Sequence, residues 1–193
     1  EHNLVLIEDG AHVIGTSYKG RMNGSIADMT TMSFHPVKTV TGGEGGAVLT
    51  NSKEYYEKLL LYRAHGITRD PKLMEHEPDG PWYYEQITLG MNYRMTDMQA
   101  ALIISQLNKL PRFMERRKAI VKAYNEAFSK LPQLFVQQEI PESDTTRHLY
   151  ILRIRPEKLT IDRKQFFEAL AAENICCNVH YIPTYYFPYY EKL

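Results

Sequence analysis

The sequence predicts an α/β fold, in which a mainly parallel sheet is followed by a smaller C-terminal α+β unit. Strand-like apolar runs alternate with helical stretches over about the first hundred residues, which is typical of parallel sheets. A long charged helical stretch then leads into a region of mixed strands and helices. We therefore expect two domains, residues 1–110 with part of the large sheet and residues 111–193 as an incomplete smaller domain.

The composition limits the classes of protein to which this chain can belong. Its 193 residues are 44% hydrophobic, and 23 basic side chains balance 23 acidic ones. A neutral chain gives no support to binding of nucleic acids or membrane surfaces. No apolar run approaches the ~20 residues of a membrane helix. The two cysteines, Cys176 and Cys177, are neighbours and cannot form a disulfide framework, so we expect a reducing, cytoplasmic location.

Buried strands are predicted where short apolar runs end in turn-forming residues. Leu4–Ile7 is one such run and ends in an acidic pair followed by glycine. Met29–Phe34 is a second run of this kind. The glycine-rich turn Gly42–Gly46 then precedes a third strand over Ala47–Thr50.

A helix and a long loop are predicted next. Asn51 or Ser52 is a good N-cap for a helix that continues to about Tyr62. Residues 66–90 are rich in proline, glycine and charge, and so form a loop. A loop of this length inside a compact domain is often functional.

The second half of the sequence begins with strongly helical segments. Thr96 is expected to cap a helix over Asp97–Leu110, and Pro111 is expected to separate it from a charged helix over Arg112–Leu131. The remaining elements predicted from the pattern are a strand over His148–Ile154, a helix from its cap Asp162 to Asn174, and a strand over Ile175–Tyr181.

Asp9 and His12 follow the end of the first predicted strand, where α/β sheets bind their ligands. A carboxylate there can hold a cationic ring nitrogen, and a histidine three residues later can reach the same ligand. The alternative is an ordinary turn in which Asp9 caps the next segment. On these residues alone, both interpretations stand.

Ser33 and Lys38 follow the second predicted strand in the same way. Burial lowers the pKa of a lysine, and a neutral amine can form a Schiff base. A hydroxyl at the strand end can hold phosphate. The alternative is a solvated loop lysine, as most lysines are.

Two further segments carry candidate ligand-binding groups. The turn Gly42–Gly46 lacks the spacing of a dinucleotide-binding loop and leads into a strand, so a close approach of the backbone to a ligand or neighbouring chain is favoured. Asn92 and Arg94 precede a helix start, where they can contact an anion, although Arg94 in a structural ion pair is the simpler interpretation. No cluster of His, Cys or Asp has metal-ligand spacing, so no metal is expected.

Taken in order, these motifs resemble the DegT/DnrJ/EryC1/StrS family of sugar aminotransferases, which are pyridoxal-phosphate enzymes of fold type I. The resemblance covers nearly the whole chain. It is carried mainly by Glu8-Asp9-x-Ala11-His12, Ser33-Phe34-His35-Pro36-x-Lys38, Glu44-Gly45-Gly46-Ala47, Arg63-x-His65-Gly66 and Gly90-x-Asn92-Tyr93-Arg94-x-Thr96-Asp97.

Within this family, the sequence is most similar to the transaminases of pseudaminic acid biosynthesis. Five segments point to them: His65–Arg69, Pro81–Gln86, Ser105–Leu107, His148–Tyr150 and Val179–Pro183. The resemblance implies transfer of an amino group from glutamate to C4 of a UDP-linked 4-keto-6-deoxy-N-acetylhexosamine. The product would be of the UDP-4-amino-4,6-dideoxy-N-acetyl-β-L-altrosamine type.

The resemblance also implies a role for each candidate residue. Lys38 would form the Schiff base with pyridoxal 5′-phosphate and move the proton, and Asp9 would pair with the pyridinium nitrogen. His12 would lie near the ring oxygen of the cofactor, and Ser33 would bind its phosphate. Asn92 would reach the phosphate or the substrate from a neighbouring subunit. The residues expected to bind the nucleotide sugar are Asn92, His180, Tyr181, Ile182 and Pro183.

The family further implies a homodimer with shared active sites, and members about twice as long as this chain. The sequence also enters an apolar strand almost at once. We therefore expect this chain to be a fragment of a longer protein, without the N-terminal portion and the extreme C-terminus of that protein. Two alternatives stay open: another nucleotide-sugar C3 or C4 aminotransferase of the family, and a catalytically inactive fragment or binding module.

Overall fold

The computed structural model describes residues 2–193 and divides the chain into two compact units. The first unit extends to Tyr124 and also contains Gln138–Tyr150. The second unit consists of Asn125–Gln137 and Ile151–Leu193. The chain therefore leaves the first unit and returns to it once. The predicted domain boundary after residue 110 lies within helix α2 (Asp97–Phe128), and the division into domains at that point stays a prediction.

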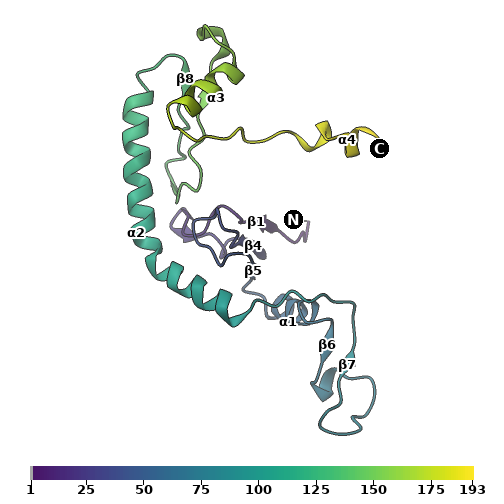
Figure 1. Ribbon diagram of the computed structural model, residues 1–193. Coiled ribbons are helices and arrows are strands. Elements are labelled where there is room, and N and C mark those ends of the chain that lie inside the picture. The colour runs from purple at the N-terminus through teal and green to yellow at the C-terminus, as the bar shows by residue number, and fades with distance from the viewer. Residues whose placement is uncertain (1) are drawn as a thin grey trace. The chain divides into compact units, whose positions relative to one another are not determined.

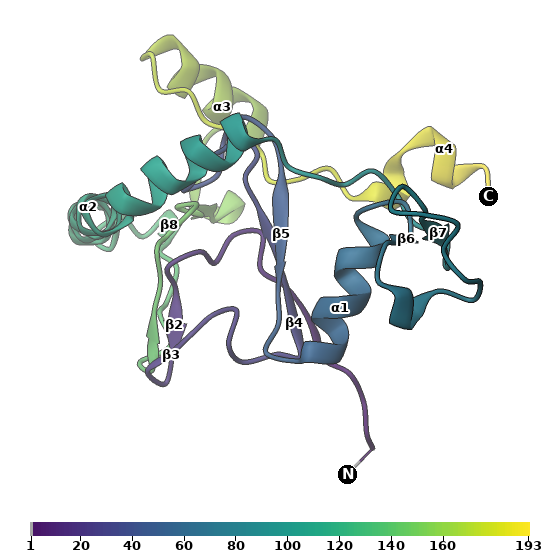
Figure 2. The ribbon, with the colours of Figure 1, turned by 90° about the horizontal axis from the view of Figure 1, so that it is seen from below.

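Three strands form the central sheet of the first unit, in the order β1-β4-β5. β1 (Ile7–Asp9) runs parallel to β4 (Met29–Ser33), whereas β5 (Gly46–Leu49) runs antiparallel to β4 (Figures 1 and 2). No helix connects β4 to β5, and parallel neighbours generally need a helical crossover. The first strand lies further along the chain than the predicted Leu4–Ile7, because its pairing with β4 carries it into the acidic residues.

One face of this sheet packs into the core. Thr30 and Met32 in β4 are buried, while Thr31 and Ser33 between and after them are partly exposed. This alternation is what a strand with one packed face produces. The core cluster on the packed side consists of Met32, Phe34, Val40 and Ile103.

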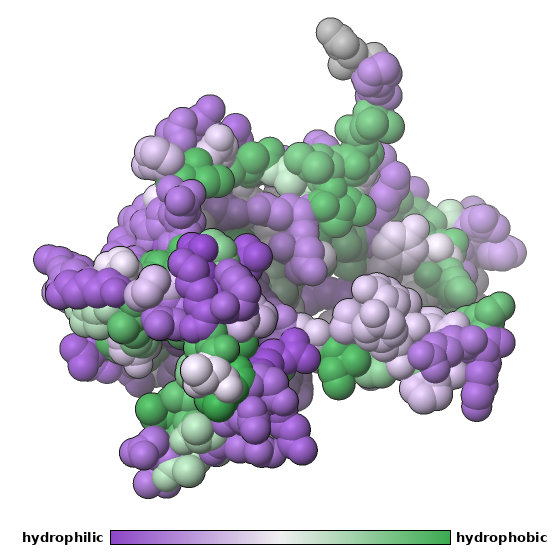
Figure 3. Space-filling model, turned by 90° about the horizontal axis from the view of Figure 1, so that it is seen from above, coloured by the Kyte–Doolittle hydropathy of each residue, from purple (hydrophilic) through white to green (hydrophobic). Residues whose placement is uncertain are grey.

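The apolar start of the chain lies at the surface. Leu4 is 83% exposed and Ile7 is 62% exposed, and Figure 3 shows this hydrophobic run on the outside of the molecule. β1 is also an edge strand of the sheet. Among residues 2–193, β1 therefore pairs with β4 alone.

A second small sheet attaches Gln138–Tyr150, the returning segment, to the rest of the first unit. β2 (Ser17–Tyr18) pairs with β3 (Arg21–Met22) on one side and with β9 (Ser143–Asp144) on the other, both antiparallel. The backbone N–H of Lys19 also donates to the carbonyl of Glu142 at 2.8 Å. The contacts of β2 and Lys19 with residues 142–144 join positions more than a hundred apart in the sequence.

Two predicted helix caps are confirmed. α1 (Lys53–Tyr62) begins after Ser52, whose hydroxyl accepts the backbone N–H of Tyr55 at 3.3 Å. α3 (Arg163–Ala172) begins after Asp162, which forms a capping box with Gln165. Side-chain acceptors at these positions satisfy N–H groups that the first helical turn leaves unpaired.

The predicted loop over residues 66–90 contains short elements. β6 (Ile67–Thr68) pairs antiparallel with β7 (Glu85–Gln86), and the 3₁₀ helix η1 (Pro71–Leu73) lies between them. The hairpin keeps the ends of the loop together. The segment is therefore more ordered than its composition suggests.

The prediction that Pro111 separates two helices is wrong, because α2 continues through it for 32 residues. Proline removes one backbone hydrogen bond, and a helix accommodates this by bending; Figure 1 shows α2 bent along its length. Ile103 and Val121 are buried on either side of Pro111, so packing holds both halves in place. Between residues 2 and 193, no helix has both the length and the apolar character needed to cross a membrane.

The second unit contains less regular structure than predicted. Its strands β8 (Leu134–Phe135) and β10 (Arg153–Ile154) pair antiparallel, so only the end of the predicted strand over His148–Ile154 forms. The strand predicted over Ile175–Tyr181 is wrong: in the described part of the chain no strand pairs with it, and its side chains are exposed. The short helices of this unit are η2 (Pro156–Lys158), η3 (Thr184–Tyr186) and α4 (Pro188–Glu191).

Candidate functional site

Asp9 and Ser33 lie on the same face of the central sheet. Asp9 is registered opposite Thr31 in the parallel β1–β4 pair. Residues two apart in a strand point to the same face, so Ser33 shares the face of Thr31 and Asp9. A carboxylate and a hydroxyl at the ends of adjacent parallel strands thus share the partly exposed face.

The neighbouring carboxylate, Glu8, belongs to the opposite face and is fully engaged in structural contacts. It accepts hydrogen bonds from Asn23 Nδ2 at 2.5 Å and from Thr30 Oγ1 at 3.0 Å. Asp9, by contrast, is exposed and accepts only the backbone N–H of Ala11 through Oδ1 at 3.1 Å, among the contacts of residues 2–193. Asp9 is therefore the acidic residue of this pair that can bind a ligand.

Lys38 follows Ser33 through a tight turn. The Ser33 hydroxyl accepts the N–H of His35 at 3.4 Å, and the N–H of Lys38 donates to the carbonyl of His35 at 2.9 Å. The Lys38 side chain is half-buried, and Thr39 and Val40 after it are buried. The turn holds the backbone of Lys38 close to the end of β4.

The backbone of the glycine-rich turn Gly42–Gly46 lies close to other residues of the same chain. A Cβ atom at Gly42 would lie 2.8 Å from the side chain of Ile103, and one at Gly46 would lie 2.7 Å from the carbonyl oxygen of Met32. The backbone N–H of Phe34 donates to the carbonyl of Gly45 at 2.8 Å, and the carbonyl of Phe34 accepts the N–H of Gly42 at 2.9 Å. The glycines thus allow β5 to pack tightly beside the end of β4.

His12 lies in the turn after Asp9, and its ring contacts that of His148. The ring centroids are 4.4 Å apart, with an interplanar angle of 57°. His12 is exposed and His148 is partly buried. His12 is thus both accessible and in contact with a ring from a distant part of the sequence.

Asn92 lies in a different part of the first unit. It forms an isolated antiparallel bridge with Ala64, and its side chain is exposed. The segment is fixed by backbone hydrogen bonds from His65 to Met91 at 2.9 Å and from Tyr93 to Arg63 at 2.9 Å. No hydrogen bond among the described residues links the Asn92 side chain to Asp9 or Ser33.

The predicted sugar-binding residues after Asn92 belong to the second unit. His180, Tyr181 and Ile182 are exposed and Pro183 is partly buried. The rings of His180 and Tyr181 lie 3.7 Å apart between centroids, at an angle of 38°. These side chains belong to an irregular segment between α3 and η3.

Glu85 organises the loop between β6 and β7. Its carboxylate accepts the N–H groups of Glu75 at 2.7 Å and His76 at 2.9 Å, and the hydroxyl of Tyr83 at 3.0 Å. These hydrogen bonds hold the pKa of the Glu85 carboxyl below its ordinary value, and the bond from the Glu75 N–H has the largest effect. The hydrogen bond that the Tyr83 hydroxyl donates to Glu85 raises the pKa of Tyr83.

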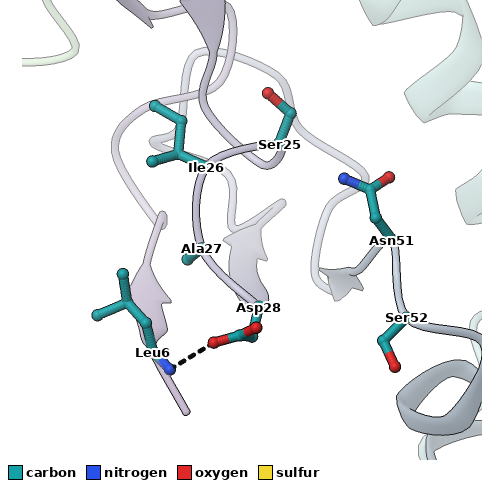
Figure 4. Close-up of a pocket in the computed structure, with 7 residues that line it drawn as sticks. All are labelled: Leu6, Ser25, Ile26, Ala27, Asp28, Asn51 and Ser52. Carbon is teal, nitrogen blue, oxygen red and sulfur yellow. Dashed lines mark hydrogen bonds between the residues drawn. The ribbon is translucent and has the colours of Figure 1, made fainter. Parts of the chain in front are cut away.

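A small pocket of about 250 Å³ lies at the opposite end of the strands (Figure 4). Asp28, which precedes β4, accepts the backbone N–H of Leu6 at 2.8 Å at its wall. The candidate site lies at the carboxyl ends of β1 and β4, so this pocket is separate from it. The remaining residues lining the pocket are Ser25, Ile26, Ala27, Asn51 and Ser52.

Sequence reasoning missed two residues beside the candidate site. Thr31 shares its face, and the period of two in β4 was a signal that could have found it. His148 contacts His12 from 136 positions away, and no local pattern marks that contact.

Comparison with known proteins places the chain among sugar aminotransferases. The family model described as the DegT/DnrJ/EryC1/StrS aminotransferase family matches residues 1–193. The uncharacterized protein MJ1066 of Methanocaldococcus jannaschii is 42% identical over 192 residues, which are 100% of this chain and 50% of that protein. The UDP-4-amino-4,6-dideoxy-N-acetyl-beta-L-altrosamine transaminase of Campylobacter jejuni is 39% identical over 193 residues, 100% of this chain and 49% of that protein.

Solved structures give the same result for the fold. Helicobacter pylori PseC, an aminotransferase of pseudaminic acid biosynthesis, has a TM-score of 0.87 at 31% identity, over 100% of this chain and 49% of PseC. Spr1654 of Streptococcus pneumoniae in its PLP form has a TM-score of 0.82 at 32% identity, over 97% of this chain and 46% of that one. The predicted α/β fold of type I is confirmed, and the chain spans about half the length of the curated relatives it matches.

Proposed function

The chain belongs to the DegT/DnrJ/EryC1/StrS aminotransferase family, and from this premise we propose that the whole protein is a pyridoxal-phosphate-dependent nucleotide-sugar aminotransferase. It transfers an amino group from glutamate to C4 of a UDP-linked 4-keto-6-deoxy-N-acetylhexosamine. The observation that carries the proposal is the shared sheet face of Asp9 and Ser33, with Lys38 held directly after it. The substrate is suggested by relatives that are UDP-amino-sugar transaminases at 31–39% identity.

The residues present fit pyridoxal phosphate by the chemistry of their donors. The cofactor has a basic ring nitrogen, a phosphate and an aldehyde, which suit a carboxylate, a hydroxyl donor and an amine respectively. Asp9 has a carboxylate oxygen without a hydrogen bond from residues 2–193, and Ser33 uses its oxygen only as an acceptor. Its hydroxyl proton is therefore available to an anion.

Pyridoxal phosphate, when bound, withdraws electrons from the carbon that carries the transferred amino group. The Asp9 carboxylate would keep a proton on the ring nitrogen, which strengthens that withdrawal. Ser33 would donate its hydroxyl proton to a phosphate oxygen. Lys38 would hold the cofactor covalently and, once released, would move a proton between the substrate carbon that bears the amino group and the aldehyde carbon of the cofactor.

Other residues would orient the cofactor and the substrate. His12 would lie beside the cofactor ring, and Asn92 would contact the phosphate or the substrate from the other subunit of a homodimer. The exposed position of Asn92 supports this, because its side chain is available to a partner. The nucleotide sugar would be bound by the exposed segment that contains His180, Tyr181, Ile182 and Pro183.

The proposed protein is a cytoplasmic homodimer whose active sites use both chains. Its neutral charge and two exposed cysteines, Cys176 and Cys177, fit a reducing compartment. Its partners are small molecules, the nucleotide sugar and glutamate, with no nucleic acid or membrane.

Turnover by the whole protein tests this proposal. The protein, loaded with pyridoxal phosphate, is incubated with glutamate and a panel of UDP- and dTDP-linked 4-keto sugars, and amino-sugar products are identified by mass spectrometry. We expect a product from a UDP-linked N-acetyl sugar, and Lys38→Ala to reduce turnover by about 10³-fold or more. The control is Lys53→Ala, which removes an exposed lysine of α1 and leaves turnover unchanged.

The other outcomes identify the alternatives. Products only from dTDP-linked sugars, or with the amino group at C3, would favour another aminotransferase of the family. No product from any keto sugar would favour a binding module and contradict the proposed activity.

A further inference from the structure

We propose that His148 is a positioning residue for His12 and fixes the orientation of the His12 imidazole beside the cofactor. This inference rests on the function proposed above and extends it to a residue outside the strand-end motifs. The direct observation is the contact between the two rings, with centroids 4.4 Å apart and an angle of 57°. Ring pairs at this separation and inclination make a favourable contact.

The backbone around the two histidines is joined on one side by a threonine pair. The N–H of Thr146 donates to Thr16 Oγ1 at 3.2 Å, and the two hydroxyl oxygens lie 3.3 Å apart. Thr146 is fully buried. The N–H of Thr16 in turn donates to the carbonyl of Val13, the residue after His12, at 2.7 Å. The turn that carries His12 is thus connected to the segment that carries His148.

The segment that carries His148 is held on its other side by α2. Nη1 of Arg117 donates to the backbone carbonyls of Arg147 at 3.0 Å and His148 at 3.2 Å. The guanidinium of Arg147 is itself buried and paired with Glu139. The backbone of His148 is therefore anchored to a long helix, which makes its ring a fixed surface.

His12 is the more exposed of the two histidines. It is exposed and belongs to a turn in which the N–H of Val13 donates to the carbonyl of Gly10 at 3.1 Å. An exposed histidine side chain samples several rotamers unless a neighbour restricts it. The His148 ring restricts it, three residues after the Asp9 strand end. This is the physical basis for assigning His148 a positioning role and not a catalytic one.

A double-mutant cycle on the whole protein tests the inference without measuring turnover. The dissociation constant of pyridoxal phosphate is measured by titration of the apo-protein, and the circular dichroism of the bound cofactor reports its orientation. We expect His148→Ala to weaken binding about three- to tenfold and to change the dichroism, and His148→Phe to restore both, because a ring remains. In a His12→Ala background, His148→Ala should have no further effect.

One control variant and one spectroscopic measurement separate positioning of His12 from general destabilisation of the protein. Tyr150→Leu disturbs the same returning segment through the Tyr124 ring, 5.1 Å away between centroids, and should leave cofactor affinity unchanged. In the apo-protein, His148→Ala should shift the His12 imidazole resonances in the ¹H–¹⁵N spectrum, because the neighbouring ring current is lost.

The outcomes distinguish this inference from the proposed function. If the wild type binds pyridoxal phosphate but His148→Ala weakens binding equally with and without His12, or His148→Phe fails to restore it, the positioning role is refuted while the function stands. If the wild type does not bind the cofactor at all, the proposed function fails and the inference fails with it.

Discussion

Arg147 places a positive charge in the interior of the first unit. Its side chain is 5% exposed, and its Nε and Nη2 atoms both donate to Oε1 of Glu139. A buried cation that loses its partner is costly, because neither water nor another group replaces the lost interaction. This ion pair therefore helps to hold the returning segment in the fold.

We expect Glu139→Ala to lower the free energy of unfolding by about 1–3 kcal/mol. The value lies between those for exposed and buried pairs, since the Glu139 side chain is itself 49% exposed. Urea denaturation measures it. Glu54→Ala, which breaks an exposed pair with Lys58 in α1, serves as the control and should lower the free energy of unfolding much less. Equal losses for the two variants would show that Arg147 does not depend on Glu139.

The carboxylate of Glu85 should make its loop sensitive to acid. The pKa of this carboxyl is lowered in the folded protein, chiefly by the hydrogen bond from the N–H of Glu75. A lowered pKa means that the ionised form stabilises the loop above the ordinary value of 4.5 and that this stabilisation is lost as pH falls through the lower folded pKa. We expect the amide protection factors of Glu75 and His76 to fall below pH 4.5, measured by hydrogen exchange.

The matched variant for that experiment is Glu85→Gln, which cannot ionise. It should show reduced protection of the same two amides at neutral pH and little further change in acid. Protection in the wild type that does not vary between neutral and acidic pH would overturn this account of the loop.

At the scale of elements, Gly15 controls how the turn after β1 packs on α2. Its φ is +80°, and an added Cβ would lie 2.9 Å from Thr146 and 3.0–3.1 Å from Met114 and Leu110. We expect Gly15→Ala to lower the free energy of unfolding by about 2–4 kcal/mol, from backbone strain and crowding together.

Gly20 provides the comparison, because it has a similar φ of +73° but no atom within 4 Å of an added Cβ. Gly20→Ala should show only the backbone cost of about 1–2 kcal/mol. Thermal or urea unfolding of both variants measures the difference. A loss at Gly15 no larger than at Gly20 would mean that the packing around Gly15 does not restrict the turn.

Elements defined by local chemistry were predictable from the sequence, and those defined by distant contacts were not. The caps Ser52 and Asp162 act on N–H groups within three residues, so their patterns are visible locally. The continuity of α2 through Pro111 depends instead on packing of both halves. The strand predicted over Ile175–Tyr181 failed because a strand also needs a partner.

The candidate site follows the same rule. The strand-end positions of Asp9, Ser33 and Lys38 can be recognised in the sequence, because each follows an apolar run. Their common face depends on the register of β1 against β4, which only the structure provides. The contact between His12 and His148 is determined by the return of the chain to the first unit, and no sequence pattern predicts it.

At the scale of the whole molecule, the proposed cofactor and sugar sites draw on different units. The residues proposed to bind the cofactor belong to the first unit, and the segment around Tyr181 belongs to the second. We therefore expect Tyr181→Ala in the whole protein to raise the KM for the nucleotide sugar about five- to tenfold, with cofactor affinity unchanged. Steady-state kinetics and cofactor titration measure the two quantities.

A second exposed tyrosine of the same unit makes the control precise. Tyr189 is 70% exposed and Tyr181 is 69% exposed, so Tyr189→Ala removes an equally accessible ring from a position with no proposed role. It should leave the KM unchanged. Equal effects of the two substitutions would count against a specific contact of Tyr181 with the sugar nucleotide.

The most direct measurement is the position of the covalent bond to the cofactor. The whole protein is incubated with pyridoxal phosphate, reduced with borohydride, digested and analysed by mass spectrometry. We expect the pyridoxyl group on Lys38, in the turn that follows β4, and we expect Lys38→Ala to abolish the labelling. Labelling of another lysine, or undiminished labelling of Lys38→Ala, would contradict this expectation.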